Sequence, residues 1–273
     1  TGQPGESAKL SDGTVYYQLE GPEDGEIVVL VHGMTIPSFV WDHSFEMLAE
    51  KGFRVLRYDL YGRGYSDRPK VKHTTDLYIR QLFELLEALK LTDQKINLIG
   101  FSLGAGIAAS FAVQYPQMIE RICLIDPVHP EDMPSAPGKI WQTMSKIRFL
   151  AIGVDQKVID GLQFNFYNYE DFPDFEEQFS EQMQYKGFAQ SLISTMIDFD
   201  YIQLNETYFQ LGKLDIPCSL FWGKEDQLAD FETSEIFKKL IPAVQFHPIP
   251  EAGHLSHYER PDLVNPILLE FLA

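Results

Sequence analysis

The sequence predicts an α/β fold: a mostly parallel central sheet with helices on both faces, plus an inserted helical cap. Two patterns lead to this fold class. Short apolar runs rich in β-branched residues alternate with amphipathic segments over residues 1–126, and the alternation returns from residue 214 to the end. Between these parts the apolar runs stop and aromatic residues accumulate. Strands that alternate with helices are typical of a parallel sheet covered on both faces.

The elements of the first half follow one another closely. After the turn at residues 11–13, an alternation of apolar and polar residues predicts a strand at an edge or in a hairpin. Wholly apolar runs predict buried strands, and periodic apolar positions predict the helices between them. The strands are expected at 14–20, 27–31, 53–58, 95–99 and 121–126, and the helices at about 39–52, at 76–89 and at 103–115.

The second half contains the insertion. Two pieces of it, 140–150 and 188–197, have the apolar spacing of helices. The sheet pattern then resumes, with strands expected at 216–222 and 244–248 and helices at 231–241 and 263–272. We therefore divide the chain into a core of residues 1–126 and 214–273 and a helical cap of residues 127–213.

A G-x-S-x-G pattern, Gly100-Phe101-Ser102-Leu103-Gly104, joins a predicted buried strand to a predicted helix. A strand that turns at once into a helix brings two backbone segments very close, so bare residues such as Gly100 and Gly104 are needed. The turn holds the Ser102 hydroxyl at the start of a helix, where the dipole favours developing negative charge. This context indicates a nucleophile, because a helix N-cap would explain a serine but not both glycines.

Composition argues against several partners and locations. The formal net charge of −18 at pH 7 opposes binding to nucleic acid and to anionic membrane surfaces. Cys123 and Cys218 lie in apolar runs and are expected to be buried rather than bridged, which fits a reducing compartment. No apolar run reaches membrane-spanning length, and residues 1–9 contain no visible signal peptide. We expect a cytoplasmic protein, although a chain that does not begin with Met leaves a removed leader open.

A serine hydroxyl needs a base to take its proton, and two late segments offer a base and an acid. Asp226 follows the strand expected at 216–222, and His254 follows the strand expected at 244–248. The carboxyl ends of parallel strands meet at one edge of a sheet, so both side chains are expected near Ser102.

Three other residues are alternatives for these roles. His257 is a second candidate base, although the place of His254 directly after Gly253 at a strand end favours His254. Glu225 and Asp126 are alternative acids. Asp126 is a candidate because it ends the strand that follows the serine.

The order of these motifs resembles that of the α/β-hydrolase fold family, in its lid-bearing, lipase- and esterase-like group. The matching segments are His32-Gly33, Gly62–Ser66, Gly100–Gly104, Gly223–Asp226 and Gly253-His254. The resemblance spans nearly the whole chain outside the cap. It implies Ser102 as nucleophile, His254 as general base and then acid, and Asp226 as the group that orients the imidazole. It also implies an oxyanion hole formed by the backbone N–H groups of Met34 and Leu103.

The resemblance also assigns structural roles and disfavours some activities. His32 resembles a family histidine that supports the oxyanion loop, and Arg63 and Asp67 are expected to hold the loop at 62–64. Dehalogenases and epoxide hydrolases of this fold carry Asp where this chain has Ser102. The sequence contains no His-Glu-x-x-His pattern, clustered His/Cys set, phosphate loop or dinucleotide fingerprint, so no metal or cofactor is expected.

These features predict a serine hydrolase that cleaves carboxylic esters of small to medium apolar substrates through an acyl-enzyme. A lactonase, or a carbon–carbon or amide hydrolase with the same three residues, is the first alternative. A ligand-binding protein on a hydrolase scaffold is the second. The expected partner is a small-molecule ester or lactone, and the sequence carries no signal for an oligomeric state.

Overall fold

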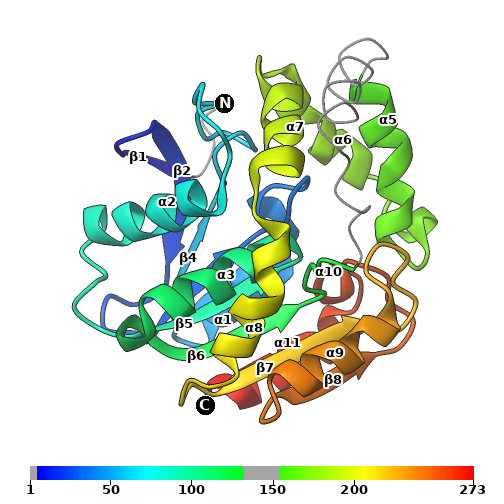
Figure 1. Ribbon diagram of the computed structural model, residues 1–273. Coiled ribbons are helices and arrows are strands. Elements are labelled where there is room, and N and C mark those ends of the chain that lie inside the picture. The colour runs from blue at the N-terminus through cyan, green and yellow to red at the C-terminus, as the bar shows by residue number, and fades with distance from the viewer. Residues whose placement is uncertain (1–4, 132–153) are drawn as a thin grey trace.

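The computed structural model describes residues 5–131 and 154–273. In these ranges the strands are β1 (Glu6–Lys9), β2 (Thr14–Glu20), β3 (Ile27–Val31), β4 (Arg54–Tyr58), β5 (Ile96–Phe101), β6 (Ile119–Ile125), β7 (Cys218–Gly223) and β8 (Gln245–Ile249). They form one eight-stranded sheet in the order β1-β2-β4-β3-β5-β6-β7-β8 (Figure 1). The β1–β2 and β2–β4 pairs are antiparallel and all other pairs are parallel, which confirms the predicted fold class.

The apolar runs correspond to the interior strands. β3, β5 and β7 are buried along their whole length, as strands covered on both faces must be. Cys123 and Cys218 are buried free thiols, as expected. The sequence did not predict β1, because its four residues are mostly polar and exposed. Such a short polar strand at the end of the sheet leaves little edge on which another chain can pair.

Helices cover both faces of the sheet (Figure 1). One face carries α2 (Thr75–Ala88), α3 (Leu103–Gln114), α8 (Leu204–Leu211) and α9 (Ser234–Leu240). The other carries α1 (Asp42–Glu50), α10 (Ser256–Glu259) and α11 (Pro261–Leu272). Short 3₁₀ helices are η1 (Ser38–Trp41), η2 (Pro116–Met118), η3 (Leu162–Asn165), η4 (Tyr169–Asp171), η5 (Glu181–Gln184), η6 (Tyr201–Gln203) and η7 (Phe231–Thr233).

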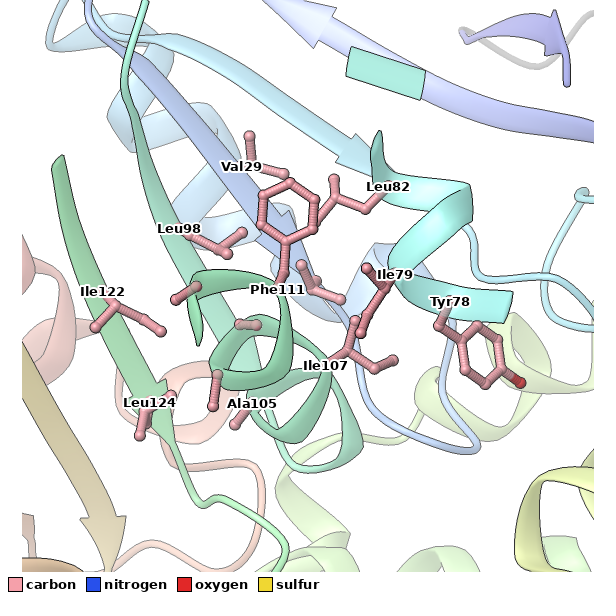
Figure 2. Close-up of a cluster of buried hydrophobic side chains, with 14 of the residues drawn as sticks. Val29, Tyr78, Ile79, Leu82, Leu98, Ala105, Ile107, Phe111, Ile122 and Leu124 are labelled. Carbon is pink, nitrogen blue, oxygen red and sulfur yellow. The ribbon is translucent and has the colours of Figure 1, made fainter. Parts of the chain in front are cut away.

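Helix α3 lies in the middle of the larger core. From Leu103 to Ala112 its residues are buried except Ser110, so the helix has no polar face and must be covered on every side. Figure 2 shows Ile107 and Phe111 of α3 beside Leu82 of α2 and Leu98 of β5. α8 packs on another side of α3. The start of this helix is therefore fixed by packing on several elements.

The described chain between β6 and β7 contains helices and loops but no strand. Its helices before α8 are α5 (Val154–Gly161), α6 (Phe175–Ser180) and α7 (Phe188–Asp198), and α7 matches the helix expected at 188–197. The helix expected at 140–150 lies outside the described residues. The boundaries of the cap at 127 and 213 stay a prediction.

The approach of β5 to α3 leaves no room for side chains at two glycines. A Cβ atom at Gly100 would lie 2.3 Å from the Gly104 carbonyl oxygen. A Cβ atom at Gly104 would lie 2.2 Å from the Val31 carbonyl oxygen, at the end of β3. Both contacts are with backbone, which cannot turn aside as a flexible side chain can. The glycines thus allow α3 to begin directly against the sheet.

We predict that Gly104→Ala lowers the free energy of unfolding by about 1–3 kcal/mol or more, because the new methyl group overlaps the backbone of β3. Gly161→Ala is the matched control. It adds the same methyl group at the end of α5, where φ is −80°. Among residues 5–131 and 154–273, no atom outside the adjoining backbone would lie within 4 Å of that methyl group. This change is expected to raise stability by about 0.4–1 kcal/mol. Urea denaturation of both variants measures the difference, and equal effects would contradict the steric account.

Candidate active site

Ser102 is the single residue between β5 and α3, and its backbone is strained. Its φ of 53° and ψ of −119° are uncommon for a residue with a side chain, and such strain costs about 1–3 kcal/mol. A hydrogen bond from Ser102 N to the Ile125 carbonyl of β6 (2.9 Å) holds the turn. The hydroxyl makes no capping bond to the helix. The N-cap interpretation of Ser102 therefore finds no support in the geometry.

His254 lies between Ser102 and Asp226. Its Nε2 atom is 2.9 Å from Ser102 Oγ, and its Nδ1 atom is 2.7 Å from Asp226 Oδ2. An ionised carboxylate only accepts hydrogen bonds, so Nδ1 carries the proton in this pair. Nε2 is then left to accept the proton of the Ser102 hydroxyl. The structure thus brings together the three residues that the sequence analysis selected.

The Asp226 carboxylate is held from its other side. Its second oxygen, Oδ1, accepts hydrogen bonds from the backbone N–H groups of Leu228 (2.8 Å) and Ala229 (3.0 Å). The side chain is fully buried, and that of His254 is 8% exposed. The loop that carries Asp226 follows the carboxyl end of β7, and the loop that carries His254 follows that of β8. Both ends lie at the edge of the sheet where Ser102 follows β5. The orientation of the imidazole is therefore fixed by bonds on both sides.

The alternative acids have other partners. Asp126 Oδ1 accepts from Gly223 N (2.7 Å), and its Oδ2 accepts from Ser256 N (3.2 Å) and Ser256 Oγ (2.6 Å). Burial, and next the negative charge of Asp226, raise the pKa of the Asp126 carboxyl above its ordinary value. Glu225 Oε2 accepts from Ala252 N (3.2 Å). Asp126 therefore ties the start of the loop that carries Asp226 to Ser256, the first residue of α10, two residues after His254.

The alternative base, His257, is a buried aromatic contact. Its ring centroid lies 4.3 Å from that of Trp41 and 4.8 Å from that of Phe101. Burial lowers the pKa of His257 to about 3. This side chain packs behind Phe101, and His254 is the histidine that reaches the serine hydroxyl.

The loop after β3 lies against the serine. A Cβ atom at Gly33 would be 3.3 Å from Ser102 Cβ. His32 Nδ1 donates to the Gly33 carbonyl (2.8 Å), and its Nε2 accepts from Leu60 N (2.9 Å). This pattern requires a neutral ring, and burial lowers the pKa of His32 to about 4. In a trans peptide the N–H points opposite to the C=O, so the Met34 N–H is directed away from His32.

Met34 and Leu103 offer two backbone N–H groups near Ser102. Leu103 is the first residue of α3, so its N–H has no acceptor within the helix. Among the described residues, no hydrogen bond from the N–H of Met34 or Leu103 to a protein acceptor is found. Met34 is expected from the resemblance to form an oxyanion hole with Leu103, and both amides remain free to do so.

A cavity of about 200 Å³ opens onto Ser102 and His254. Its other walls are mainly apolar. They are formed by Met34, Thr35, Ile36, Phe101, Val128, Asn165, Leu228 and Ala229. Of the described residues in the predicted cap segment, Val128 and Asn165 of η3 contribute to this wall, and Asn165 Nδ2 donates to the Leu162 carbonyl (3.0 Å). The hydroxyl and the imidazole thus face a small apolar chamber.

A model of the α/β hydrolase fold family matches residues 26–261, which is most of the chain. The chain belongs to the α/β hydrolase fold family. The match begins just before β3 and continues into α11, so it includes the serine, the acid, the histidine and the segment between β6 and β7.

Individual relatives of this family cover nearly the whole chain. A protein of Bacillus subtilis (strain 168), provisionally named 2-succinyl-6-hydroxy-2,4-cyclohexadiene-1-carboxylate synthase, is 29% identical over 97% of both chains. The structure is similar to that of a thermophilic esterase from Thermogutta terrifontis, with a TM-score of 0.81, 25% identity and 98% coverage of both chains. It is also similar to an enol-lactonase from Burkholderia xenovorans LB400, with a TM-score of 0.83, 20% identity and coverage of 98% and 99%. The family match supports a hydrolase, and the structural likenesses show that the fold is shared along nearly the whole chain.

Glu259 contributes to the site without being predicted from the sequence. Its Oε1 atom accepts from Gly253 N (2.7 Å), next to His254, and its Oε2 atom accepts from Tyr167 N (2.7 Å). Burial raises the pKa of this carboxyl. Leu255 N also donates to the Asn165 carbonyl (3.1 Å). The segment around η3 is thus bonded directly to the loop that carries the histidine in this α/β hydrolase fold.

Within residues 5–131 and 154–273, no three His, Cys, Asp or Glu side chains converge as metal ligands would. In the same part of the chain no helix has both the length and the apolar character needed to cross a bilayer.

We predict that His257→Phe changes how stability depends on pH. The folded-state pKa of His257, about 3, is below the ordinary value of 6.5, so below pH 6.5 the unfolded chain binds a proton that the folded protein does not. Wild-type stability from this source therefore falls as the pH falls, by about 1.4 kcal/mol per unit. Between pH 7.5 and 5, urea denaturation should show the variant gaining about 2 kcal/mol relative to wild type. Parallel pH profiles would contradict this assignment.

Proposed function

We propose that the protein is a serine hydrolase that cleaves carboxylic esters of small to medium apolar substrates through an acyl-enzyme. One observation carries the proposal: a continuous hydrogen-bonded chain runs from Asp226 through His254 to Ser102, at the wall of an apolar cavity. A hydroxyl bonded to an imidazole whose other nitrogen is held by a carboxylate is the arrangement that activates serine for attack.

The proposed reaction proceeds in two halves. Ser102 Oγ attacks the ester carbonyl carbon while its proton passes to His254 Nε2, and the carbonyl oxygen becomes an oxyanion. When the electron pair returns, the bond to the alcohol oxygen breaks and His254 donates its proton to that oxygen. A water molecule then attacks the acyl-enzyme and gives a proton to His254. The carboxylic acid leaves as Ser102 Oγ regains that proton.

The proposed oxyanion hole consists of the Met34 and Leu103 N–H groups. Preorganised donors in a chamber with few competing waters stabilise developing charge more strongly than water does. The Leu103 amide lies at the N-terminus of the twelve-residue α3, whose dipole adds to this effect. His32 supports the other donor by fixing the Gly33–Met34 peptide.

The cavity bears on substrate size. Drug-sized ligands occupy pockets of about 300–1,000 Å³, so a chamber of about 200 Å³ favours a short acyl or alcohol group. We also propose that residues 127–213 form a cap over the site. Asn165, which belongs to that segment, lines the cavity together with Ser102 and His254. The likeness to the Thermogutta terrifontis esterase is consistent with ester hydrolysis.

We predict that the protein hydrolyses p-nitrophenyl esters with an optimum at short acyl chains. Ser102→Ala should lower kcat by at least about 10³-fold, because the nucleophile is lost. A fluorophosphonate should label wild type but not Ser102→Ala. Release of p-nitrophenol measures the esters, and a lactone and amide panel is run beside them. The ester proposal fails if wild type opens lactones briskly and esters feebly.

Other outcomes identify the alternatives. Cleavage of amides or carbon–carbon bonds alone would assign the same three residues to those substrates. If Ser102 is labelled but no substrate is hydrolysed, a synthase activity of the kind named for the Bacillus subtilis relative becomes the better candidate function. Neither labelling nor turnover in folded protein would leave a ligand-binding protein on a hydrolase scaffold.

We predict opposite patterns for the two buried aspartates. Asp226→Asn should lower kcat by about 10⁴-fold, because the amide NH2 group favours the wrong imidazole tautomer. The loss of stability should be small, because the amide oxygen still accepts from Leu228 N and Ala229 N and the NH2 group donates to Nδ1 of that tautomer. Asp126→Asn should lower kcat less than about tenfold but cost about 1–3 kcal/mol of stability, since its carboxyl accepts three hydrogen bonds that an amide cannot all accept. Steady-state kinetics and urea denaturation measure both. A larger kcat loss in Asp126→Asn would move the acid to Asp126.

A further inference from the structure

Three successive carbonyl groups after β3 each accept a hydrogen bond from a buried side chain. The Gly33 carbonyl accepts from His32 Nδ1 (2.8 Å), the Met34 carbonyl from Arg63 Nε (2.6 Å) and the Thr35 carbonyl from Gln182 Nε2 (3.1 Å). The three carbonyls belong to Met34 and its two neighbours in the chain, and the Met34 N–H is one of the two proposed oxyanion donors. The loop is therefore held by side chains rather than by a strand or helix of its own.

The third donor, Gln182, belongs to the predicted cap. It lies in η5, more than fifty residues after β6 in the chain, and is only 3% exposed. Its carboxamide makes two bonds, since Nε2 donates to the Thr35 carbonyl and Oε1 accepts from Gly64 N (3.2 Å). One side chain from η5 thus joins the loop after β3 to the loop after β4.

Arg63 forms a second link to the same segment. Its fully buried guanidinium donates to the Met34 carbonyl, to the hydroxyl of Tyr78 on α2 (2.8 Å) and to the hydroxyl of Thr195 on α7 (2.8 Å). These bonds anchor the loop at 62–64, as expected of Arg63. In addition it connects the oxyanion loop to α7, a helix of the predicted cap.

We propose that Gln182 is a positioning residue that assembles the oxyanion hole when the cap is seated, an inference that rests on the proposed function. Without Gln182, the Thr35 carbonyl and the buried Gly64 N–H would both lack their partner, and a buried polar group without a partner is unfavourable. The loop regains hydrogen bonds by rotating its peptides, and rotation at Thr35 moves the adjacent Met34 unit. Seating of the cap and alignment of the Met34 N–H are thus coupled through one carboxamide.

The test compares Gln182→Met with Gln178→Met. Methionine keeps the length of the side chain but neither donates nor accepts as the amide does. Gln178 lies four residues earlier, in α6, where its side chain is exposed, so it is the matched control. Gln182→Glu is a second variant, which keeps an acceptor for Gly64 N but loses the donor to Thr35 as long as it is ionised.

Gln182→Met is expected to lower kcat on a short p-nitrophenyl ester by about 10- to 100-fold, as misplacement of a catalytic donor does, with KM within about twofold of wild type. Its affinity for phenylboronic acid, whose tetrahedral serine adduct presents an oxygen to the oxyanion hole, should fall by a similar factor. Gln182→Glu should follow it, and Gln178→Met should match wild type. A change confined to KM, or a Gln182→Met variant equal to its control, overturns the inference.

Hydrogen–deuterium exchange separates this inference from the proposed function. The amides of residues 33–36 should exchange faster in Gln182→Met than in Gln178→Met, and this comparison needs no turnover. Equal exchange in the two variants overturns the positioning role even if wild type is an active esterase. Faster exchange in a protein that hydrolyses nothing supports the link between η5 and the loop while rejecting the ester hydrolase.

Discussion

The direct passage from β5 into α3 is the constraint on which the rest of the structure depends. One residue, Ser102, makes the turn, and glycines on either side let the helix begin against backbone atoms of its own strand and of β3. This arrangement stores strain that only tight packing can hold. The largely apolar α3 supplies that packing, because it is buried against the sheet, α2 and α8. The position of a single hydroxyl is thus set by the core of the whole domain.

Three carboxylates beside the histidine have different partners, and the donors around each one determine its role. Asp226 accepts the imidazole N–H, Asp126 accepts from both neighbouring loops, and Glu259 accepts from the histidine loop and from the segment around η3. They lie close enough to repel one another, and burial raises the pKa of the last two. The site therefore owes its rigidity to acids that take no part in the proposed chemistry.

The sequence predicted the interior of the sheet and the residues at its carboxyl edge, because both follow from local patterns. Strand β3 is a continuous apolar run, and Ser102, Asp226 and His254 each come within a few residues of the carboxyl end of a strand. Residues that bond to distant parts of the chain show no such local pattern in the sequence. Gln182 and Glu259 lie in short helices with ordinary polar spacing, and their partners are backbone groups far away in the chain. Only the packing of the segment between β6 and β7 brings them together.

The insertion between β6 and β7 also affects the order in which the protein is made. These strands are parallel neighbours, yet roughly ninety residues separate them in the chain, and closing so long a loop delays their pairing. At typical rates of translation the ribosome needs about 5–20 s to synthesise that segment. During this interval β6 presents an open parallel edge, of the kind that associates with other unfinished chains. The same insertion that contributes a wall to the mature cavity thus makes the nascent protein dependent on protection of that edge.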